Sequence, residues 1–132
     1  MKKFQKYIKK GVVEPLETVS FHGKAPINRL LMLDKKRVPD ANVRVAVHFV
    51  TDVPKNVPAY CELHKHDCDE INLILSEDGA LVYKVQLEDE VYEVTSPATI
   101  FIPKGIRHSA EVISGKGMFV CILLEGEYNA SK

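Results

Sequence analysis

Two histidines separated by a single residue, His64 and His66, are the part of this sequence best suited to chemistry, and Glu70 follows four residues later. On a β-strand, side chains alternate between the two faces, so both imidazoles would point the same way, about 7 Å apart along the strand. If the chain stays extended, the even spacing returns the Glu70 carboxylate to that face. These three donors predict a site for a transition-metal ion, with His108, from a neighbouring strand, as the fourth candidate ligand.

The elements that must position these ligands are short apolar segments separated by turns rich in Gly and Pro. They predict strands at residues 27–33, 43–50, 60–66, 71–75, 80–87, 91–94, 99–102, 109–113 and 118–124. Many short strands at regular spacing favour an all-β sandwich or barrel. Residues 2–10 carry apolar side chains at helical spacing, which predicts a short amphipathic helix that ends at Gly11.

The overall composition is that of one compact domain, since the chain has 132 residues, of which 45% are hydrophobic. No apolar run approaches the ~20 residues that a membrane span requires. The basic N-terminus lacks the apolar segment of a secretion signal. The three cysteines are odd in number and form no CxxC pattern, which favours reduced thiols. We therefore expect a cytoplasmic protein that does not bind a membrane.

The charges are unevenly distributed although the formal net charge is zero. Residues 1–40 contain ten Lys and Arg against four Asp and Glu, whereas residues 41–132 contain eight against fourteen. A nucleic-acid-binding protein would normally show a basic surface with aromatic residues among the charges. The basic excess lies mainly in the first ten residues, so we expect a solvated N-terminal segment and no nucleic-acid partner. A basic arm that docks on an acidic surface is the alternative.

The two histidine segments match a known pattern. The first segment reads His64-Lys65-His66, then three further residues and Glu70, and this spacing agrees with the core of the first motif of the cupin superfamily, HxH-x3-4-E. The second segment reads Pro103-Lys104-Gly105, then two further residues and His108, and this spacing agrees with the core of the second motif, PxG-x2-H. The framing positions differ, because the family's glycines and final Asn fall here on Pro58, Pro97 and Val112, and the closing glycine of the first motif comes late, at Gly79. The chain thus resembles the cupins over residues 43–124, and in particular the small single-domain (monocupin) metal-binding type.

The resemblance implies a double-stranded β-helix, or jelly-roll barrel, with one metal ion bound by His64, His66, Glu70 and His108. Neutral imidazoles and a carboxylate suit Fe, Mn, Ni, Cu, Co or Zn as divalent ions, and the spacing alone does not choose among them. Four ligands on an octahedral ion leave two positions open for a substrate or dioxygen. The alternative is that these residues form only a hydrogen-bonded polar cluster.

Strand parity predicts which side chains surround this site. Tyr60 and Glu62 share the face of the two motif histidines, so both are expected to point into the barrel, where either one is a candidate proton-transfer group. Asn72 shares the parity of Glu70 and is expected to orient its carboxylate. Ala110 and Val112, which share the parity of His108, are expected to line the pocket.

The strand at residues 43–50 can be oriented in two ways. If Val45, Val47 and Phe49 face the core, then Arg44 and His48 point to solvent, and we expect this arrangement because the first set is apolar. In the opposite arrangement, Arg44 and His48 would supply a cation for an acidic substrate inside the barrel.

The expected organisation is one domain, with an N-terminal arm and edge strand at residues 1–40 packed on a barrel at residues 41–132. The resemblance implies a homodimer and a small-molecule ligand or substrate. It favours a metal-dependent, dioxygenase-like enzyme acting on a small polar or acidic metabolite. A redox-neutral isomerase or lyase and a non-catalytic binding or sensing protein stay open as alternatives. No helix-turn-helix segment is present that would favour a transcriptional role.

Overall fold

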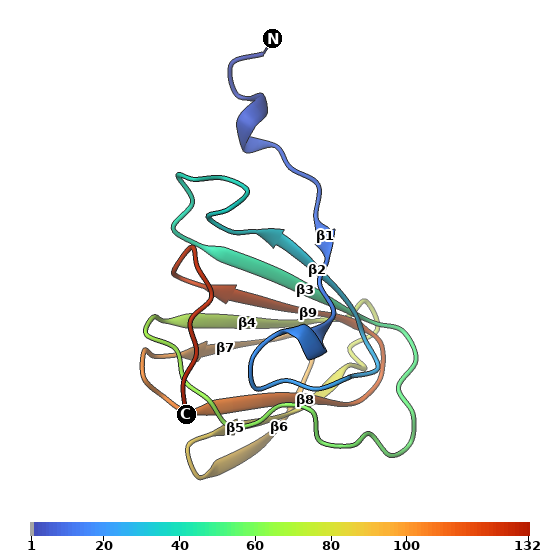
Figure 1. The fold of residues 1–132 in the computed structure, drawn as a ribbon. Coiled ribbons are helices and arrows are strands. Elements are labelled where there is room, and N and C mark those ends of the chain that lie inside the picture. Colours follow the sequence, from blue (N-terminus) through green and yellow to red (C-terminus); the bar gives the residue numbers. More distant parts are fainter. Residues whose placement is uncertain (1) are drawn as a thin grey trace.

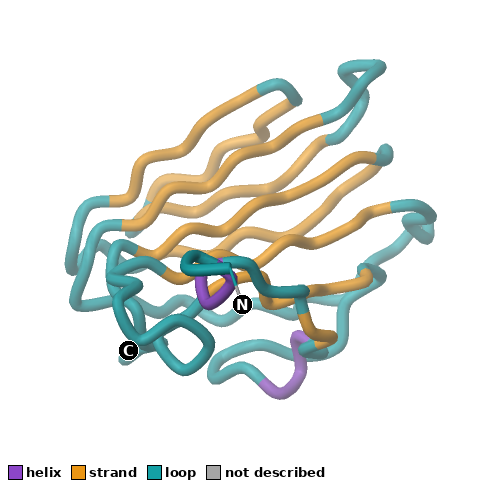
Figure 2. The backbone as a smooth tube through the Cα atoms, turned by 90° about the horizontal axis from the view of Figure 1, so that it is seen from above, coloured by secondary structure: helices purple, strands orange, loops and turns teal. Residues whose placement is uncertain are grey.

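The computed structural model describes residues 2–132 and consists of two antiparallel β-sheets (Figure 1). The strands are β1 (Val12–Val13), β2 (Asn28–Leu33), β3 (Arg44–Val50), β4 (Glu70–Leu75), β5 (Val82–Leu87), β6 (Glu90–Thr95), β7 (Ala98–Ile102), β8 (His108–Ser114) and β9 (Gly117–Leu123). The first sheet has the order β1-β2-β3-β9-β4-β7 and the second has the order β6-β5-β8. Figure 2 shows the strands running side by side across the molecule, with loops gathered at their ends. The predicted all-β class is confirmed.

The core lies between the two sheets, because both sheets contribute fully buried apolar side chains to one cluster. The largest of these are Tyr83, Ile74, Leu81, Val50 and Val85. Tyr83 of β5 stacks on Phe119 of β9 with their ring centroids 4.5 Å apart, which joins the small sheet to the large one. Among residues 2–132, no helix is long and apolar enough to cross a membrane.

The predicted helix at residues 2–10 is wrong. This segment contains only the 3-10 turn η1 (Gln5–Tyr7), which stands clear of the sheets in Figure 1. Phe4, Tyr7 and Ile8 are 62%, 46% and 72% exposed. A helix this short is marginal without tertiary packing, and its apolar side chains stay largely exposed. A second 3-10 turn, η2 (Leu16–Thr18), follows β1 and buries Leu16.

The predicted strand at residues 60–66 is also wrong as a regular strand. The segment instead makes isolated bridges to three different parts of the chain, pairing Cys61 with His22, His64 with His108 and Lys65 with Ser131. Because no continuous ladder forms, strict alternation of side chains does not hold along this segment.

Strand β3 has the orientation opposite to the one we expected. Arg44 and His48 are 6% and 7% exposed and face inward, whereas Val45 and Val47 are half-buried on the outer face and Phe49 is 37% exposed. The pairing with β9 sets this direction, because Arg44 lies opposite Leu123 and His48 opposite Phe119. Residues directly opposite in antiparallel strands share a face, and these two β9 residues are buried in the interior.

Candidate metal centre

Backbone pairing brings the two motif segments together. The amide of His64 donates to the carbonyl of His108 (3.1 Å), and the amide of His108 donates back to the carbonyl of His64 (2.8 Å). The amide of Gly105 donates to the carbonyl of His66 (3.0 Å). These backbone contacts at the start of β8 therefore hold three imidazoles side by side, with ring centroids 4.6 to 5.1 Å apart.

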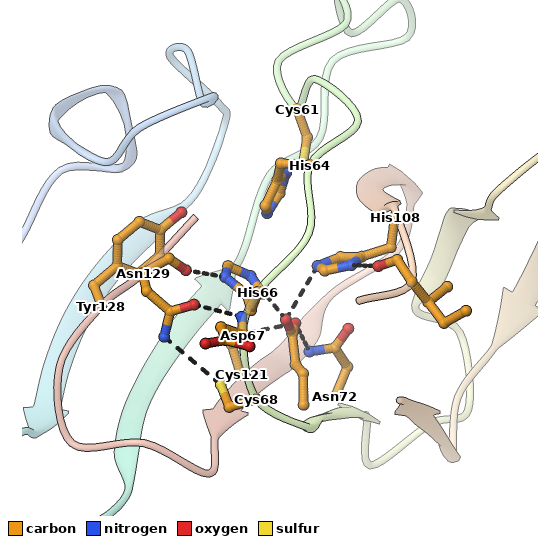
Figure 3. Close-up of polar contacts among 12 residues, drawn as sticks. Cys61, His64, His66, Asp67, Cys68, Asn72, His108, Cys121, Tyr128 and Asn129 are labelled. Atoms are coloured by element: carbon orange, nitrogen blue, oxygen red, sulfur yellow. Dashed lines mark hydrogen bonds and ion pairs between the residues drawn. The ribbon is translucent and has the colours of Figure 1, made fainter. Parts of the chain in front are cut away.

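Glu70 opens strand β4 in the middle of the large sheet, between β9 and β7. Its carboxylate is almost fully buried, and its Oε1 lies 3.1 Å from Nε2 of His66 and 3.1 Å from Nε2 of His108. Its Oε2 accepts a hydrogen bond from the side-chain amide of Asn72 (2.7 Å), as Figure 3 shows. The expectation that Asn72 orients Glu70 is thereby confirmed, and the structure adds the thiol of Cys121, 3.4 Å from the same oxygen.

The three imidazoles are held in one tautomer by backbone carbonyls. Nδ1 of His64 bonds to the carbonyl of Glu62 (2.7 Å), Nδ1 of His66 to that of Asn129, and Nδ1 of His108 to that of Ile106 (2.9 Å). A carbonyl can only accept, so each Nδ1 carries the hydrogen and each Nε2 carries a lone pair in the neutral ring. The structure thus presents three buried nitrogen lone pairs to one point.

Nε2 of His108 and Oε1 of Glu70 are both buried and face each other, and while the ring of His108 is neutral neither atom carries a proton to donate. Burial alone would raise the pKa of the Glu70 carboxyl, but hydrogen bonding and charge attraction from His108 and His66 outweigh it and hold that pKa well below its ordinary value. Burial likewise lowers the pKa of His108, and the contact with Glu70 outweighs it and raises that pKa. The site therefore favours a positive charge between these groups, either a proton or a metal ion.

His64 is unlike His108, because no carboxylate compensates for its burial. Burial lowers the pKa of His64 to about 4, against the opposing effect of its hydrogen bond to the Glu62 carbonyl. His64 is consequently a neutral imidazole at physiological pH, which is the form that binds metals.

The donor set fits a divalent transition-metal ion. The ligating atoms of His64, His66 and His108 all lie within 4.8 Å of one another, and all three residues are buried. Adjacent ligands on an ion with bonds of ~2.1 Å are ~3.0–3.4 Å apart, so each imidazole would move inward by up to about 1 Å to close the site. Three imidazoles and one carboxylate suit Fe, Mn, Co, Ni, Cu or Zn. The four ligands predicted from the sequence are thus the residues that the structure brings together.

The remaining cavity is small, with a volume of about 50 Å³, and its far wall is cationic. Arg29 of β2 and Arg44 of β3 line it, and both guanidiniums bind the carboxylate of Glu14, Arg44 at a distance of 2.9 Å. Nε of Arg29 donates to Nε2 of His48 (3.1 Å), so Nδ1 of His48 carries that ring's hydrogen. This N–H is buried and has no partner among residues 2–132. This part of the lining thus carries two guanidiniums and one buried N–H donor.

The structure separates the two predicted proton-transfer residues. Tyr60 is buried and lines the cavity, but its hydroxyl accepts a hydrogen bond from the backbone N–H of Val112 (2.8 Å), and burial raises its pKa. Glu62 does not point into the barrel, contrary to expectation: it is exposed and lies 3.6 Å from the ammonium of Lys132. The reason is the irregular 60–66 segment, in which side chains do not alternate.

Other residues near the motifs lie as follows. Ala110 lines the cavity, as predicted, whereas Val112 packs in the core. Cys68 is half-buried beside Asn129 and outside the cavity lining. Sequence reasoning missed His22, which lines the cavity from the N-terminal segment. It stands outside both motifs and outside any predicted strand, so only the tertiary structure reveals it.

Comparisons with known proteins identify the class of fold. No family sequence model and no curated protein sequence matches the chain. Among solved structures, an RmlC-like cupin from Shewanella frigidimarina NCIMB 400 superposes with a TM-score of 0.59 at 10% identity, covering 96% of this chain and 89% of that one. KdgF from Halomonas sp. has a TM-score of 0.56 at 13% identity, over 78% of this chain and 82% of its own.

A third similar structure is the oxalate decarboxylase of Bacillus subtilis, with a TM-score of 0.57 at 13% identity. It matches 92% of this chain, which spans only 31% of that longer protein. At such low identities the likeness establishes the fold alone. The protein has the cupin fold, a jelly-roll barrel of antiparallel strands, as the two motifs predicted, and its histidine cluster is of the kind that binds a metal ion.

Proposed function

We propose that this protein is a metal-dependent cupin enzyme, dioxygenase-like, that acts on a small acidic metabolite. The observation that carries the proposal is that one cavity is lined by two chemically different groups of residues. One wall presents three Nε2 lone pairs and the Glu70 carboxylate, and the other presents Arg29, Arg44 and the free Nδ1–H of His48. A divalent transition-metal ion held at the first wall would supply Lewis acidity and open coordination positions.

The protein's own side chains would bind and orient the substrate. Two guanidiniums share one carboxylate, Glu14, so this wall keeps a net positive charge that attracts a substrate carboxylate. The Nδ1–H of His48 would donate a hydrogen bond to the same group. The volume of about 50 Å³ restricts the ligand to a few non-hydrogen atoms. Leu16 and Phe119, also in the lining, exclude water from the remaining surface.

The identity of the metal ion belongs to the proposal. Among the similar structures, the oxalate decarboxylase of Bacillus subtilis has Mn(II) centres, and the donor set here suits Mn(II) and Fe(II) equally well. Dioxygenase-like chemistry requires a redox-active ion, whereas an isomerase or lyase would tolerate Zn(II). Proton transfer by Tyr60 stays a prediction, since its hydroxyl is already engaged by the backbone of β8.

Metal analysis followed by oxygen-uptake measurements tests the proposal. The purified full chain would be reconstituted anaerobically with Fe(II), Mn(II) or Zn(II), beside His108→Ala and the matched control Lys104→Ala. Lys104 is exposed in the same segment and pairs only with exposed Asp67. About one equivalent of metal in the wild type and the control, and little in His108→Ala, would support the site. Equal metal contents in all three proteins would refute it.

Oxygen uptake then separates the functional classes, with small mono- and dicarboxylates as trial substrates. Consumption that needs both Fe(II) or Mn(II) and a carboxylate supports the dioxygenase-like reaction. Conversion with Zn(II) and without oxygen indicates an isomerase or lyase. Thermal stabilisation by a carboxylate that is recovered unchanged indicates a binding protein.

The homodimer is likewise a proposal. The outer face of the large sheet carries exposed Phe49, Leu75, Phe101 and Met118, which favours burial against a second copy. The N-terminal forty residues would add contacts by strand exchange. Sedimentation of the chain as a monomer at micromolar concentration would contradict this assembly. A cytoplasmic location is compatible with the three free cysteines and stays a prediction.

A further inference from the structure

A second cluster of metal-ligating atoms adjoins the centre described above. The ligating atoms of His22, Cys61 and His64 all lie within 4.8 Å of one another. Cys61 stands beside His64 in Figure 3, at the edge of the site away from Asn72. Of these three residues, only His64 belongs to the cupin motifs, so the cluster is a feature of this chain's own N-terminal segment.

Backbone hydrogen bonds hold the cluster together. His22 and Cys61 face each other in an isolated bridge. On either side of it, the amide of Glu62 donates to the carbonyl of Phe21 (2.9 Å) and the amide of Gly23 donates to that of Tyr60 (2.7 Å). The ring of Phe21 also stacks on that of His64, with the planes 3° apart. The arrangement is therefore built by tertiary structure rather than by chance contact of surface side chains.

The two imidazoles of the cluster are oriented for ligation. Nδ1 of His22 bonds to the carbonyl of Ser20 (2.8 Å), and Nδ1 of His64 bonds to that of Glu62. Each Nε2 therefore carries a lone pair, and the rings meet edge to face with their centroids 5.0 Å apart. A carbonyl bond on Nδ1 is the usual second-shell contact of a metal-binding histidine. Cys61 adds a sulfur that lies 3.9 Å from the backbone carbonyl of Glu62.

We propose that Cys61, His22 and His64 form a second cation subsite that takes a thiophilic ion such as Zn(II) or Co(II). Two imidazoles and a thiolate are a softer donor set than the imidazole and carboxylate set around Glu70. On binding, the thiol releases its proton to solvent and the sulfur forms a bond to the ion.

The geometry requires a small closure. Ligand atoms around a tetrahedral zinc or cobalt ion lie ~3.3–3.7 Å apart, so the cluster must contract by about 1 Å from its present spread. His22 is only half-buried and lies in the loop between η2 and β2, where such a movement is easiest. The fourth position would be taken by water or a ligand.

The two sites are coupled through His64, because its single Nε2 lone pair can bind only one ion at a time. When a thiophilic ion takes His64, the first centre keeps His66, His108 and Glu70, which is the two-histidine, one-carboxylate set of many iron sites. Both sites can thus be filled together, and the second ion reduces the protein ligands of the first from four to three. The subsite does not depend on the proposed catalytic activity.

Anaerobic cobalt titration of the metal-free, reduced full chain tests the proposal. We expect a sulfur-to-cobalt charge-transfer band in the near ultraviolet within a twofold molar excess of Co(II). The band should vanish in Cys61→Ser, and His22→Ala should weaken the affinity that it reports by more than about tenfold. Cys121→Ser is the matched control, since Cys121 is the other thiol of the cavity lining and should be dispensable for the band.

The outcomes are separable from those of the proposed function. Visible d–d bands that survive Cys61→Ser but are lost in His66→Ala report the first centre alone. Circular dichroism of each variant confirms that it is folded. A wild type without a charge-transfer band overturns the subsite, as does a band that persists in Cys61→Ser or that disappears instead in Cys121→Ser.

Discussion

Glu14 is the residue whose replacement should report most directly on the cationic wall of the cavity. Its carboxylate binds both Arg29 and Arg44, whose side chains are only 4% and 7% exposed, while its own is 26% exposed. Burial would raise the pKa of Glu14, but hydrogen bonds and attraction from the two guanidiniums outweigh it and lower that pKa. Glu14→Gln keeps the shape of the side chain and removes its charge, so two buried cations lose the carboxylate that pairs with them.

The expected cost is about 2 kcal/mol in the free energy of unfolding. Breaking a buried ion pair by removing one partner costs about 3–5 kcal/mol. The value is reduced here because Glu14 is a quarter exposed, so water can replace part of the interaction, and because glutamine still accepts one hydrogen bond. Urea unfolding at neutral pH measures the loss. Glu17→Gln is the matched control, since Glu17 is exposed in the neighbouring turn and its replacement should change stability by less than about 0.5 kcal/mol.

Small carboxylates should restore the stability of this variant. The uncompensated guanidiniums line the cavity, so formate or acetate can take the place of the Glu14 carboxylate. An anion at about 100 times its dissociation constant contributes about 2.7 kcal/mol, enough to offset the loss. Chloride at the same ionic strength controls for screening. The reasoning is refuted if Glu14→Gln behaves like Glu17→Gln, or if carboxylates stabilise the variant no more than the wild type.

Three further predictions concern the core, the turns and the metal. The hydroxyl of Tyr83 is buried without a partner among the described residues, so Tyr83→Phe should stabilise the protein by up to about 1 kcal/mol in urea unfolding. Tyr60→Phe should instead destabilise it by about 1–3 kcal/mol, because it leaves a backbone N–H of β8 unpaired. Gly115 has φ +92°, and a Cβ there would lie 1.9 Å from a carbonyl oxygen, so Gly115→Ala should lower the stability by about 3 kcal/mol or more in thermal unfolding. Gly105 has φ +84° but open space around it, so Gly105→Ala should lower the stability by only about 1–2 kcal/mol. A chelator should lower the melting temperature of the metal-loaded wild type and leave that of His108→Ala unchanged, because only a bound ion adds stability by mass action.

The strands could be predicted well because their signal is local. Eight of the nine observed strands, all but β1, correspond to predicted segments whose ends agree to within two residues. Alternating apolar residues bounded by Gly and Pro turns are a property of each segment by itself. The four ligands followed from spacing within two short motifs, so they also required no knowledge of tertiary contacts.

The direction of β3 could not be predicted in the same way, because its more apolar face is not the one that points inward. Val45, Val47 and Phe49 form the more apolar face, yet the inward face carries Arg44 and His48. The hydrophobic pattern fails here because this part of the interior is a polar cavity, and its charges are compensated by Glu14 from a distant segment. Such compensation is invisible in the strand itself. Glu62 was misplaced for a related reason, since parity was applied to a segment that forms no ladder.

The sequence predicts a metal site but no substrate, because the motif residues bind the metal and residues outside the motifs would contact the substrate. The two motifs supply the ligands His64, His66, Glu70 and His108, which would serve many reactions. The residues that would distinguish one small anion from another, and one ion from another, come from outside them. Arg29 and His22 lie in the first forty residues and line the cavity, and Glu14 of the same segment binds Arg29. This segment is therefore part of the site rather than an appendage to the barrel, and its ligand preference follows from tertiary structure.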